Sequence, residues 1–354
     1  MAGFVLKLSR QAAGLTQEKL AELLDVDPTT VQGWESGRRP LAAVGAGEVV
    51  RLSARLSRAG APASTGRHLN EAIEADLVLS TGIAAGGSWV DPDHHPLASA
   101  VHRKTTTNLV TWPFTGNTPP QLGEFISAVP RRGPVASRPL LRPDEQSRFF
   151  DHLRHVVERA DHAKEPLLRR QSVYLLGFDR REEVIDWLRD EWHRVSRRAV
   201  SENHITGLLE ARSASVALAS TGEREHIDAF VSRMSSAQDE TANLNYWAYW
   251  IGELRDVRVD DSFMRDEDTR TWDGSTLLTH LVTRLDPTTP HLPLNLHTLH
   301  TLVASRPSLL DGRPRLRTAL AESLDELASG DALSHTGRDE VAGLRYALRI
   351  SERH

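Results

Sequence analysis

The sequence predicts an all-α protein, with a small helical bundle at the N-terminus followed by a large irregular array of antiparallel helices. Apolar residues recur at three- and four-residue spacing through most of the chain, as they do on one face of an α-helix. Turn and cap signals divide this pattern into many segments, and short connections favour antiparallel neighbours. No repeat of fixed length is visible, so we expect an irregular array.

The N-terminal bundle is expected to begin and end with two amphipathic helices. The first has the apolar stripe Phe4, Val5, Leu8 and Ala12, and the last has the stripe Val49, Leu52 and Leu56. Gly14 ends the first helix, and Gly60 with Pro62 ends the last. These signals predict a first domain of residues 1–60.

Between these helices, residues 15–40 have the pattern of two short helices joined by a tight turn. Thr16 is a suitable N-cap for the first of them, and its apolar face consists of Leu20, Leu23 and Leu24. Asp25-Val26-Asp27 interrupts that face. Asp27 followed by Pro28 marks a second helix start, because proline is favoured at the first helical position. The pattern is typical of a helix-turn-helix.

The second helix of the pair carries short hydrogen-bonding side chains on its outer side. Val31 and Trp34 are spaced to face inward, and Gly37 ends the helix. The outer surface suits base edges in the DNA major groove, where glutamine pairs with adenine and a threonine methyl meets a thymine methyl. We therefore expect base contacts by Asp27, Thr29, Thr30, Gln32 and Gly33, and phosphate contacts by Thr16, Gln17, Ser36, Arg38 and Arg39.

Residues 4 to about 59 resemble the lambda-repressor-like, or Xre-type, helix-turn-helix domain of bacterial and phage regulators. The residues at the family's spacing are Leu15-Thr16-Gln17, Leu20-Ala21, Val26, Val31, Trp34-Glu35 and Gly37. The resemblance implies a phosphate contact by Gln17 and a partly buried ion pair between Arg10 and Glu35. Asp25 departs from the glycine that the family often has in a left-handed turn, a conformation that Asp tolerates. Pro28 and Gly33 offer no side-chain hydrogen bond, which leaves fewer base readers than usual.

Positive charge is concentrated near this second helix, although the formal charge of the whole chain is -5. Residues 1–59 have a charge balance of +2, and the remaining residues have a balance of -7. From Arg38 to Arg58 there are five arginines and a single acid, Glu48. This distribution is the electrostatic footprint of a DNA contact, with the acidic remainder facing away from DNA.

The composition excludes several other classes of protein. A chain of 354 residues with a hydrophobic share of 39% can bury a sizeable core. The lack of cysteine excludes disulfides, thiolate metal sites and cysteine nucleophiles. No apolar run is long enough to span a membrane and no signal peptide pattern is visible, so we expect a cytoplasmic protein without membrane contact.

Residues 61–142 are expected to be a linker and an irregular wrapped segment with short helices. The stretch GAPASTG is hinge-like, and helices are expected only at 68–79, 95–108 and 121–129. Leu69, Ile73 and Leu77 define one face of the first of these. Two interpretations remain open: a linker lying on the larger domain, or a second DNA or partner contact through the basic residues Arg103, Lys104, Arg131 and Arg132.

Residues 143–354 are expected to form a helical dimerisation and regulatory domain. Helices are predicted at 149–160, 167–176, 184–195, 203–220, 223–236, 239–253, 274–285, 293–304, 313–329 and 337–350. The segments NLNYWAYWIGEL and LNLHTLHTLVASRPSLL are similar to the C-terminal halves of actinobacterial Xre-type regulators. That resemblance implies only a regulatory or dimer-forming role.

Two groups of histidines were weighed as metal ligands. Asp91, Asp93, His94, His95 and His102 crowd one loop, where short polar side chains also commonly bond their own backbone. His297 and His300 share a helix face but are surrounded by leucines, which favours partly buried, hydrogen-bonded histidines. We expect neither group to be a metal site, and no cofactor is expected.

An aromatic cluster at Tyr246, Trp247, Tyr249 and Trp250 stands out in a chain with only 6% aromatic residues. On one helix these rings cannot all face the same core. Core packing is the first interpretation. A dimer interface or an effector pocket is the second, with Asn243, Asn245 and Glu253 as nearby polar groups.

Catalytic motifs are absent from the sequence. There is no phosphate-binding glycine loop with lysine, no Gly-x-Ser-x-Gly elbow and no His-Glu-x-x-His. The acidic pairs Asp260-Asp261 and Glu182-Glu183 are typical of solvated surface charge. We therefore expect no enzyme, with a helical enzyme fused to a DNA-binding head as a remote alternative.

The expected function is that of a transcriptional regulator that binds double-stranded DNA as a homodimer on a palindromic operator. The helical region 143–354 is where a small-molecule or protein effector is expected to act. Two alternatives remain open. The helix-turn-helix can be a protein-interaction module, or it can be a DNA-binding head on an uncharacterised helical sensor.

Overall fold

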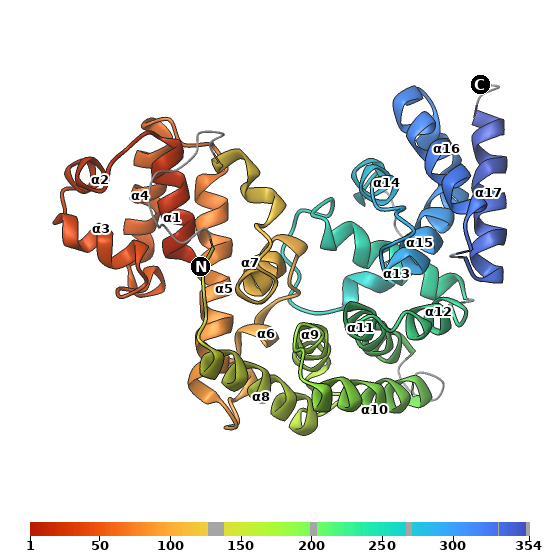
Figure 1. The fold of residues 1–354 in the computed structure, drawn as a ribbon, viewed down its shortest axis with the longest axis horizontal. Helices are drawn as coiled ribbons and strands as arrows, with labels where there is room; N and C mark the ends of the chain where they lie inside the picture. Colours follow the sequence, from red (N-terminus) through yellow and green to blue (C-terminus); the bar gives the residue numbers. More distant parts are fainter. Residues whose placement is uncertain (127–137, 199–203, 235, 267–270, 332, 352–354) are drawn as a thin grey trace. The chain divides into compact units, whose positions relative to one another are not determined.

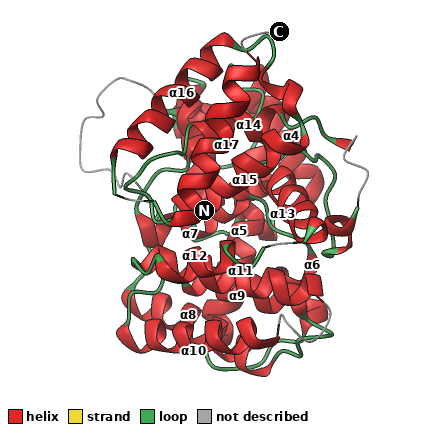
Figure 2. Cartoon of the chain, turned by 90° about the vertical axis from the view of Figure 1, so that its right-hand side faces the viewer, coloured by secondary structure: helices red, strands yellow, loops and turns green. Residues whose placement is uncertain are grey.

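The computed structural model describes residues 1–126, 138–198, 204–234, 236–266, 271–331 and 333–351. Over these residues every regular element is a helix and none is a strand, as Figures 1 and 2 show. The predicted all-α fold class is confirmed. No helix in this part of the chain is long and apolar enough to cross a membrane.

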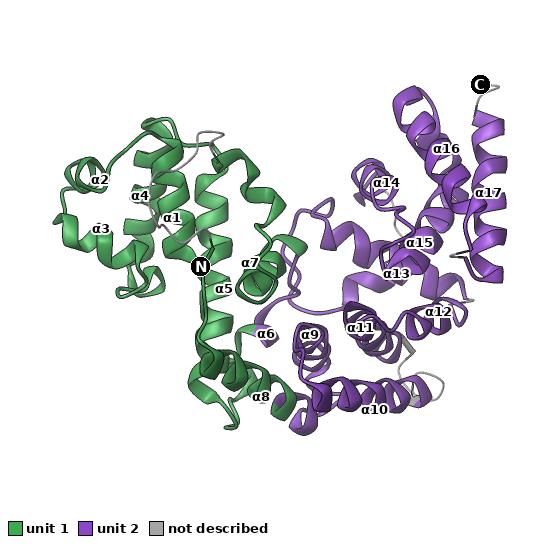
Figure 3. Ribbon diagram, viewed as in Figure 1, with its two compact units in different colours: residues 1–96, 104–155 green, residues 97–103, 156–354 purple. Residues whose placement is uncertain are grey.

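The chain divides into two compact units (Figure 3). Unit 1 comprises residues 1–96 and 104–155, and unit 2 comprises residues 97–103 and 156–354. This grouping differs from the regions expected at 1–60, 61–142 and 143–354, because helices after residue 60 pack within unit 1. Independent folding of residues 1–60 stays a prediction.

Unit 1 begins with the predicted helical bundle. Its elements are α1 (Ala2–Ala12), α2 (Gln17–Leu24), α3 (Pro28–Glu35), the 3-10 helix η1 (Leu41–Ala43) and α4 (Ala46–Arg58). Val5, Leu20 and Val31 are completely buried in its core. Gly3 lies so close to α3 that a Cβ atom there would be 2.1 Å from the carbonyl oxygen of Trp34. The absence of a side chain at Gly3 therefore lets α1 pack directly on the end of α3.

Helix α5 (Thr65–Ala85) packs against both α1 and α4 and is longer than the predicted helix at 68–79. Its buried residues include Leu69, Ala72, Ala75 and Val78. Leu77 is 43% exposed, so its predicted place on the inward face was wrong. Positions spaced only by four drift around a helix of 3.6 residues per turn, whereas steps of three and four alternate along the buried set Thr65, His68, Ala72, Ala75, Leu79 and Gly82.

The segment expected to be irregular contains one substantial helix. Its elements are η2 (Pro92–His94), α6 (Pro96–Ser99), α7 (Lys104–Thr115) and η3 (Pro120–Phe125), followed by α8 (Pro143–Arg159). Helix α7 packs on α5 and buries Leu109, Val110 and Trp112. Pro113 lies inside this helix, in its last turn, where it removes one backbone hydrogen bond without ending the helix before Thr115. Part of the helix predicted at 121–129 lies outside the described residues.

Unit 2 contains helices close to those predicted from the sequence. They are α9 (Pro166–Leu176), α10 (Glu182–Arg198), α11 (His204–Thr221), α12 (Glu225–Val231), α13 (Ala237–Trp250), η4 (Ser262–Arg265), α14 (Ser275–Val282), α15 (Leu292–Ser305), η6 (Pro307–Leu310), α16 (Pro314–Ser329) and α17 (His335–Ser351). Helix α11 packs against α9, α10 and α12. Its small residues allow close approach: a Cβ at Gly177 would lie 2.6 Å from the Cα of Ala217.

Candidate nucleic-acid interface

The recognition helix α3 is held in place by a buried ion pair at its C-terminal end. Nε and Nη2 of Arg10 lie 2.5 and 3.0 Å from the two carboxylate oxygens of Glu35. The side chains are only 9% and 4% exposed, and Nη1 of Arg10 also donates to the carbonyl of Leu15. The ion pair implied by the family resemblance is therefore present. It ties α1 and the loop before α2 to the last residue of α3.

Both helices of the motif begin with the predicted caps. Thr16 Oγ1 accepts from the backbone N–H of Lys19, and Asp27 Oδ1 accepts from that of Thr29. Asp25 between the helices adopts the left-handed conformation expected of it, with φ of 57°. The turn therefore has the geometry that the family's glycine normally supplies.

The Asp27 carboxylate is occupied by the recognition helix itself. It accepts from both the backbone N–H and the hydroxyl of Thr29, at 2.8 and 2.6 Å. These bonds lower the pKa of Asp27, the hydroxyl bond having the largest effect. Asp27 and Thr29 were both expected to contact bases. In the structure they hold each other at the helix N-terminus, with both residues exposed.

Arg39 lies along the outer surface of α3. Its backbone N–H donates to the carbonyl of Gly33, and its Nη1 donates to Thr30 Oγ1 at 3.0 Å. Gly33 is buried beneath it, and a Cβ there would lie 3.1 Å from Cδ of Arg39. Gly33 thus leaves space for the Arg39 side chain, whose guanidinium lies beside Thr30, a residue expected to contact bases.

Gln32 and Arg38 are the exposed polar residues next to this arginine. No hydrogen-bond partner of the Gln32 side chain occurs among the described residues. Arg38 Nε donates to Ser36 Oγ at 3.3 Å, and that hydroxyl donates to the Gly33 carbonyl at 3.2 Å. Ser36 therefore links Arg38 to the end of α3.

The side-chain amide of Gln17 takes part in the contacts that hold α3. Its Nε2 donates to Oε2 of Glu35 at 2.7 Å, so one amide hydrogen serves the Arg10 ion pair. The amide carries a second hydrogen, which remains suited to a phosphate oxygen. The predicted DNA contacts of all ten residues stay predictions.

Residues 6–44 match a family model described as helix-turn-helix. The match begins within α1 and includes α2, α3 and η1. The N-terminal domain is therefore a helix-turn-helix domain of the lambda-repressor-like, or Xre, type, as the sequence predicted. Such a domain suggests a DNA-binding regulator. No curated protein and no solved structure matches the chain.

The basic residues after residue 100 were the second candidate for a DNA contact. Among them, Arg103 makes contacts within unit 2. Arg103 Nη2 donates to the carbonyls of Leu254 and Asp256, each at 3.1 Å, and its guanidinium lies 4.8 Å from the ring centre of Tyr249. Arg131 and Arg132 lie outside the described residues. Arg103 thus closes a loop of unit 2, and the DNA-contact interpretation of this segment stays a prediction.

The histidine-rich loop is divided between separate interactions. Asp91 Oδ1 accepts from the N–H of Asp93, while Nε2 of the buried His95 lies 3.0 Å from Nε2 of the buried His152. Burial lowers the pKa of His152. His94 is exposed, and His102 belongs to unit 2. The absence of a required metal ion there stays a prediction.

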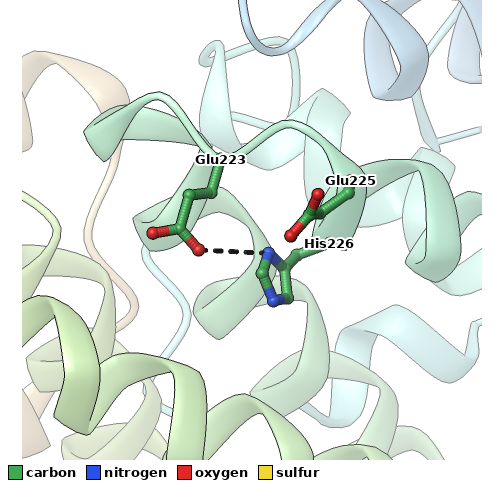
Figure 4. A group of neighbouring side chains, drawn as sticks. All are labelled: Glu223, Glu225 and His226. Atoms are coloured by element: carbon green, nitrogen blue, oxygen red, sulfur yellow. Dashed lines mark ion pairs between the residues drawn. The ribbon is translucent and has the colours of Figure 1, made fainter.

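A different set of metal-ligating groups lies at the start of α12 (Figure 4). Single ligand atoms of Glu223, Glu225 and His226 lie within 4.8 Å of one another. However, Nε and Nη2 of Arg189 lie 2.9 and 2.5 Å from Oε1 of Glu223. The guanidinium already supplies the positive charge that a metal ion would bring. All three groups lie within four consecutive residues, but they were not predicted as a site, because such a stretch is also typical of surface charge.

The aromatic cluster and His297 are core residues of unit 2. Tyr246, Trp247 and Tyr249 are at most 7% exposed. Nδ1 of His297 lies 2.6 Å from Oε1 of Glu340, and its Nε2 lies 3.0 Å from Oε1 of Glu240. The expectation of a buried, hydrogen-bonded His297 is therefore confirmed.

The polar residues near the aromatic cluster also have structural partners. Asn245 Nδ2 donates to the Asp266 carbonyl at 2.7 Å, and its Oδ1 accepts from Trp272 Nε1 at 3.0 Å. The Glu253 carboxylate accepts from the N–H groups of Gly274 and Leu277, at the start of α14. These contacts position the loops after α13, so the side chains of Asn245 and Glu253 already have partners within the protein.

Proposed function

We propose that the chain is a sequence-specific DNA-binding transcriptional regulator whose helix α3 enters the major groove. The observation that carries this proposal is the exposed polar surface of α3, set on a frame that matches the helix-turn-helix family over residues 6–44. Thr29 and Gln32 are exposed there, and Arg38 and Arg39 adjoin them. Such side chains serve base edges and phosphates respectively.

We further propose that Arg39 reads a base instead of holding a phosphate. Its guanidinium is fixed beside Thr30 on the outer surface of α3, whereas Arg38 bonds Ser36 beyond the helix end. Arginine pairs with guanine through two parallel hydrogen bonds, the commonest specific contact in the major groove. Arg39 then compensates for Gly33, which offers no side-chain hydrogen bond.

We propose a homodimer on a palindromic operator, with the dimer contact after residue 143 and an effector acting in the same region. A single helix-turn-helix makes few contacts, and dimers of this type bind half-sites about one DNA turn apart. Sedimentation of the full chain at about 10 μM tests this, since a nanomolar dimer is fully formed at that concentration. A monomer that binds its operator with full affinity would refute it.

The proposed regulator works without enzymatic activity and acts in the cytoplasm, where its DNA is. The competing function is a helix-turn-helix that binds a protein. Salt separates the two, because displacement of counterions makes DNA binding fall steeply as salt rises, whereas an apolar protein contact is much less affected.

Selection of bound duplexes from a random pool, followed by binding isotherms at several salt concentrations, tests the DNA-binding function. We expect a two-fold symmetric motif and a steep salt dependence. Arg315→Ala is the matched control, because it removes an exposed arginine from α16 of unit 2. If no sequence is enriched and Arg38→Ala plus Arg39→Ala binds DNA like the control, the proposal is wrong.

A further inference from the structure

We propose that unit 2 binds a small anion, carrying a carboxylate or phosphate group, at the buried guanidinium of Arg212. The proposal goes beyond the regulatory function above, because an anion can bind there whether or not α3 binds DNA. It rests on a buried arginine without a counterion and on the aromatic residues around it.

Arg212 lies in the middle of α11 and is only 6% exposed. Its guanidinium stacks on aromatic rings of α13, 4.2 Å from the ring centre of Tyr246 and 5.4 Å from that of Trp247. Its Nε has no hydrogen-bond acceptor. Among the described residues, no carboxylate pairs with Arg212. Its partners there are aromatic side chains, with Tyr246 also a hydrogen-bond partner, and a buried charge that has no anion beside it is costly, so an oxyanion is the complement that we propose.

The neighbouring Arg170 shows what a completed site of this kind looks like. It is 3% exposed and also faces Tyr246, at 5.6 Å. Nε and Nη2 of Arg170 donate to the two oxygens of Asp261 at 2.9 and 2.5 Å, the bidentate geometry that guanidinium prefers. Of the two arginines that face Tyr246, Arg170 is paired with a carboxylate, whereas Arg212 is not.

Positive charge accumulates around Arg212 beyond these two arginines. Burial and the charges of Arg212 and Arg284 lower the pKa of His291 to about 4. His291 therefore stays neutral near pH 7, and its Nδ1 has no hydrogen-bond partner. Asp261 is paired with Arg170, and no acid is among the groups that shift the pKa of Arg212 or of His291 in the described part of the chain. An incoming anion meets a positive potential and unused donors.

The aromatic rings next to Arg212 indicate what kind of group the proposed anion carries. Tyr174 packs edge-on against Trp250 with ring centres 5.7 Å apart, and Trp250 stacks on Tyr246 at 6.1 Å. Tyr174 and Trp250 are half-buried, so this aromatic wall extends from Arg212 toward solvent. A flat apolar body attached to the anionic group fits such a wall. The probe that reproduces these features is benzoate.

Isothermal titration calorimetry of the full chain with sodium benzoate tests the site, with ionic strength held constant by NaCl. Benzamide, which has the same shape without the charge, is the ligand control. Inorganic phosphate in a separate series distinguishes a phosphate ligand from a carboxylate one. Arg212→Gln removes the charge, and Arg212→Lys retains it without the planar fork. Arg233→Gln is the matched protein control, because Arg233 is an exposed arginine stacked on Trp192 at 5.4 Å.

We expect saturable one-to-one binding of benzoate, no binding of benzamide, at least tenfold weaker binding to both Arg212 variants, and unchanged binding to Arg233→Gln. Saturation by phosphate alone supports the anion site and identifies phosphate as the ligand group. The proposal is overturned if neither anion shows saturable binding up to about 10 mM, because a dissociation constant above that value is too weak for a specific site. The proposal is also overturned if the folded Arg212→Lys and Arg212→Gln variants bind the anion as tightly as the wild type does.

Discussion

The polar groups around α3 and those in the core of unit 2 are arranged in opposite ways. Around α3 the partners are close in sequence and exposed, as in Asp27 with Thr29 and Arg39 with Thr30. In unit 2 the partners are buried and far apart, as in Arg170 with Asp261, which are 91 residues apart. The first kind of site depends on local helix geometry and the second on tertiary structure. A surface that reads DNA must leave its donors free, whereas a buried site must satisfy each charge.

One pair in the N-terminal domain belongs to the second kind. Arg10 and Glu35 are 25 residues apart and buried, although each lies in the helix-turn-helix. This pair fixes the frame on which the exposed residues lie. Breaking it is expected to have the largest effect of the changes considered below.

We expect Glu35→Ala to destabilise unit 1 by about 3–5 kcal/mol, because it leaves the buried Arg10 charge without a partner. Urea unfolding measures the loss. The double variant Arg10→Met plus Glu35→Leu is the control, since an apolar pair of similar volume is expected to recover most of the stability. If the single variant were as stable as the double variant, the ion pair would not brace α3.

The buried histidine of unit 2 predicts a pH dependence with a definite sign. Burial alone would lower the pKa of His297, but Glu240 and Glu340 outweigh it and raise the pKa to about 9. The bound proton therefore stabilises the fold fully below pH 6.5, by about 3 kcal/mol, and this contribution is lost as pH rises through 9.

Urea unfolding of wild type and His297→Gln near pH 6 and pH 9.5 checks this expectation. The stability difference between the two proteins should be large at the lower pH and small at the higher one. His335→Gln is the control, because His335 pairs with Asp339 but is 88% exposed. A difference that stays constant between the two pH values would contradict the raised pKa.

Features that depend on local contacts could be predicted from the sequence, and features that depend on tertiary packing could not. Thr16, Asp27 and Pro28 define helix starts by local chemistry, so the helix-turn-helix and its exposed face are readable from the sequence. The Arg212 site is not readable in this way. The signal in the sequence was Arg212 within ARSASVALAS, a stretch of small and apolar residues. The rings that contact Arg212 lie on α13, and only tertiary packing brings them next to it.

Two features of α3 were also beyond the sequence. Gly33 looked like part of the reading surface, and the structure shows it under the Arg39 side chain. Arg39 was expected to contact a phosphate, which stays a prediction, and its hydrogen bond to Thr30 is the observation behind the alternative role proposed above. Both depend on how the chain turns back after Gly37, which has a φ of 76°. The return is held by local backbone bonds, from Gly37 to Trp34 and from Arg39 to Gly33, whose geometry the helical pattern alone does not predict.

We expect Gln32→Ala and Arg39→Ala each to cost about 1–3 kcal/mol on the preferred duplex and little on random DNA, because each removes a base contact. Binding isotherms on both duplexes measure the difference. Gly33→Ala tests the positioning of Arg39, since the added Cβ would lie 3.1 Å from its Cδ and push the guanidinium away from Thr30. Equal losses on specific and random DNA would show that these residues do not read sequence.

The smallest expected effect is that of Arg38→Ala, and it sharpens the contrast between the two arginines after α3. Arg38 is exposed and bonds Ser36 beyond the helix, so its proposed partner is a phosphate. Removing one phosphate contact lowers the slope of log affinity against log salt by about one. Specific and random duplexes should therefore weaken alike, and the loss relative to wild type should shrink about fourfold between 50 and 200 mM salt. If instead Arg38→Ala weakened only the preferred duplex and left the salt slope unchanged, the roles of Arg38 and Arg39 would have to be exchanged.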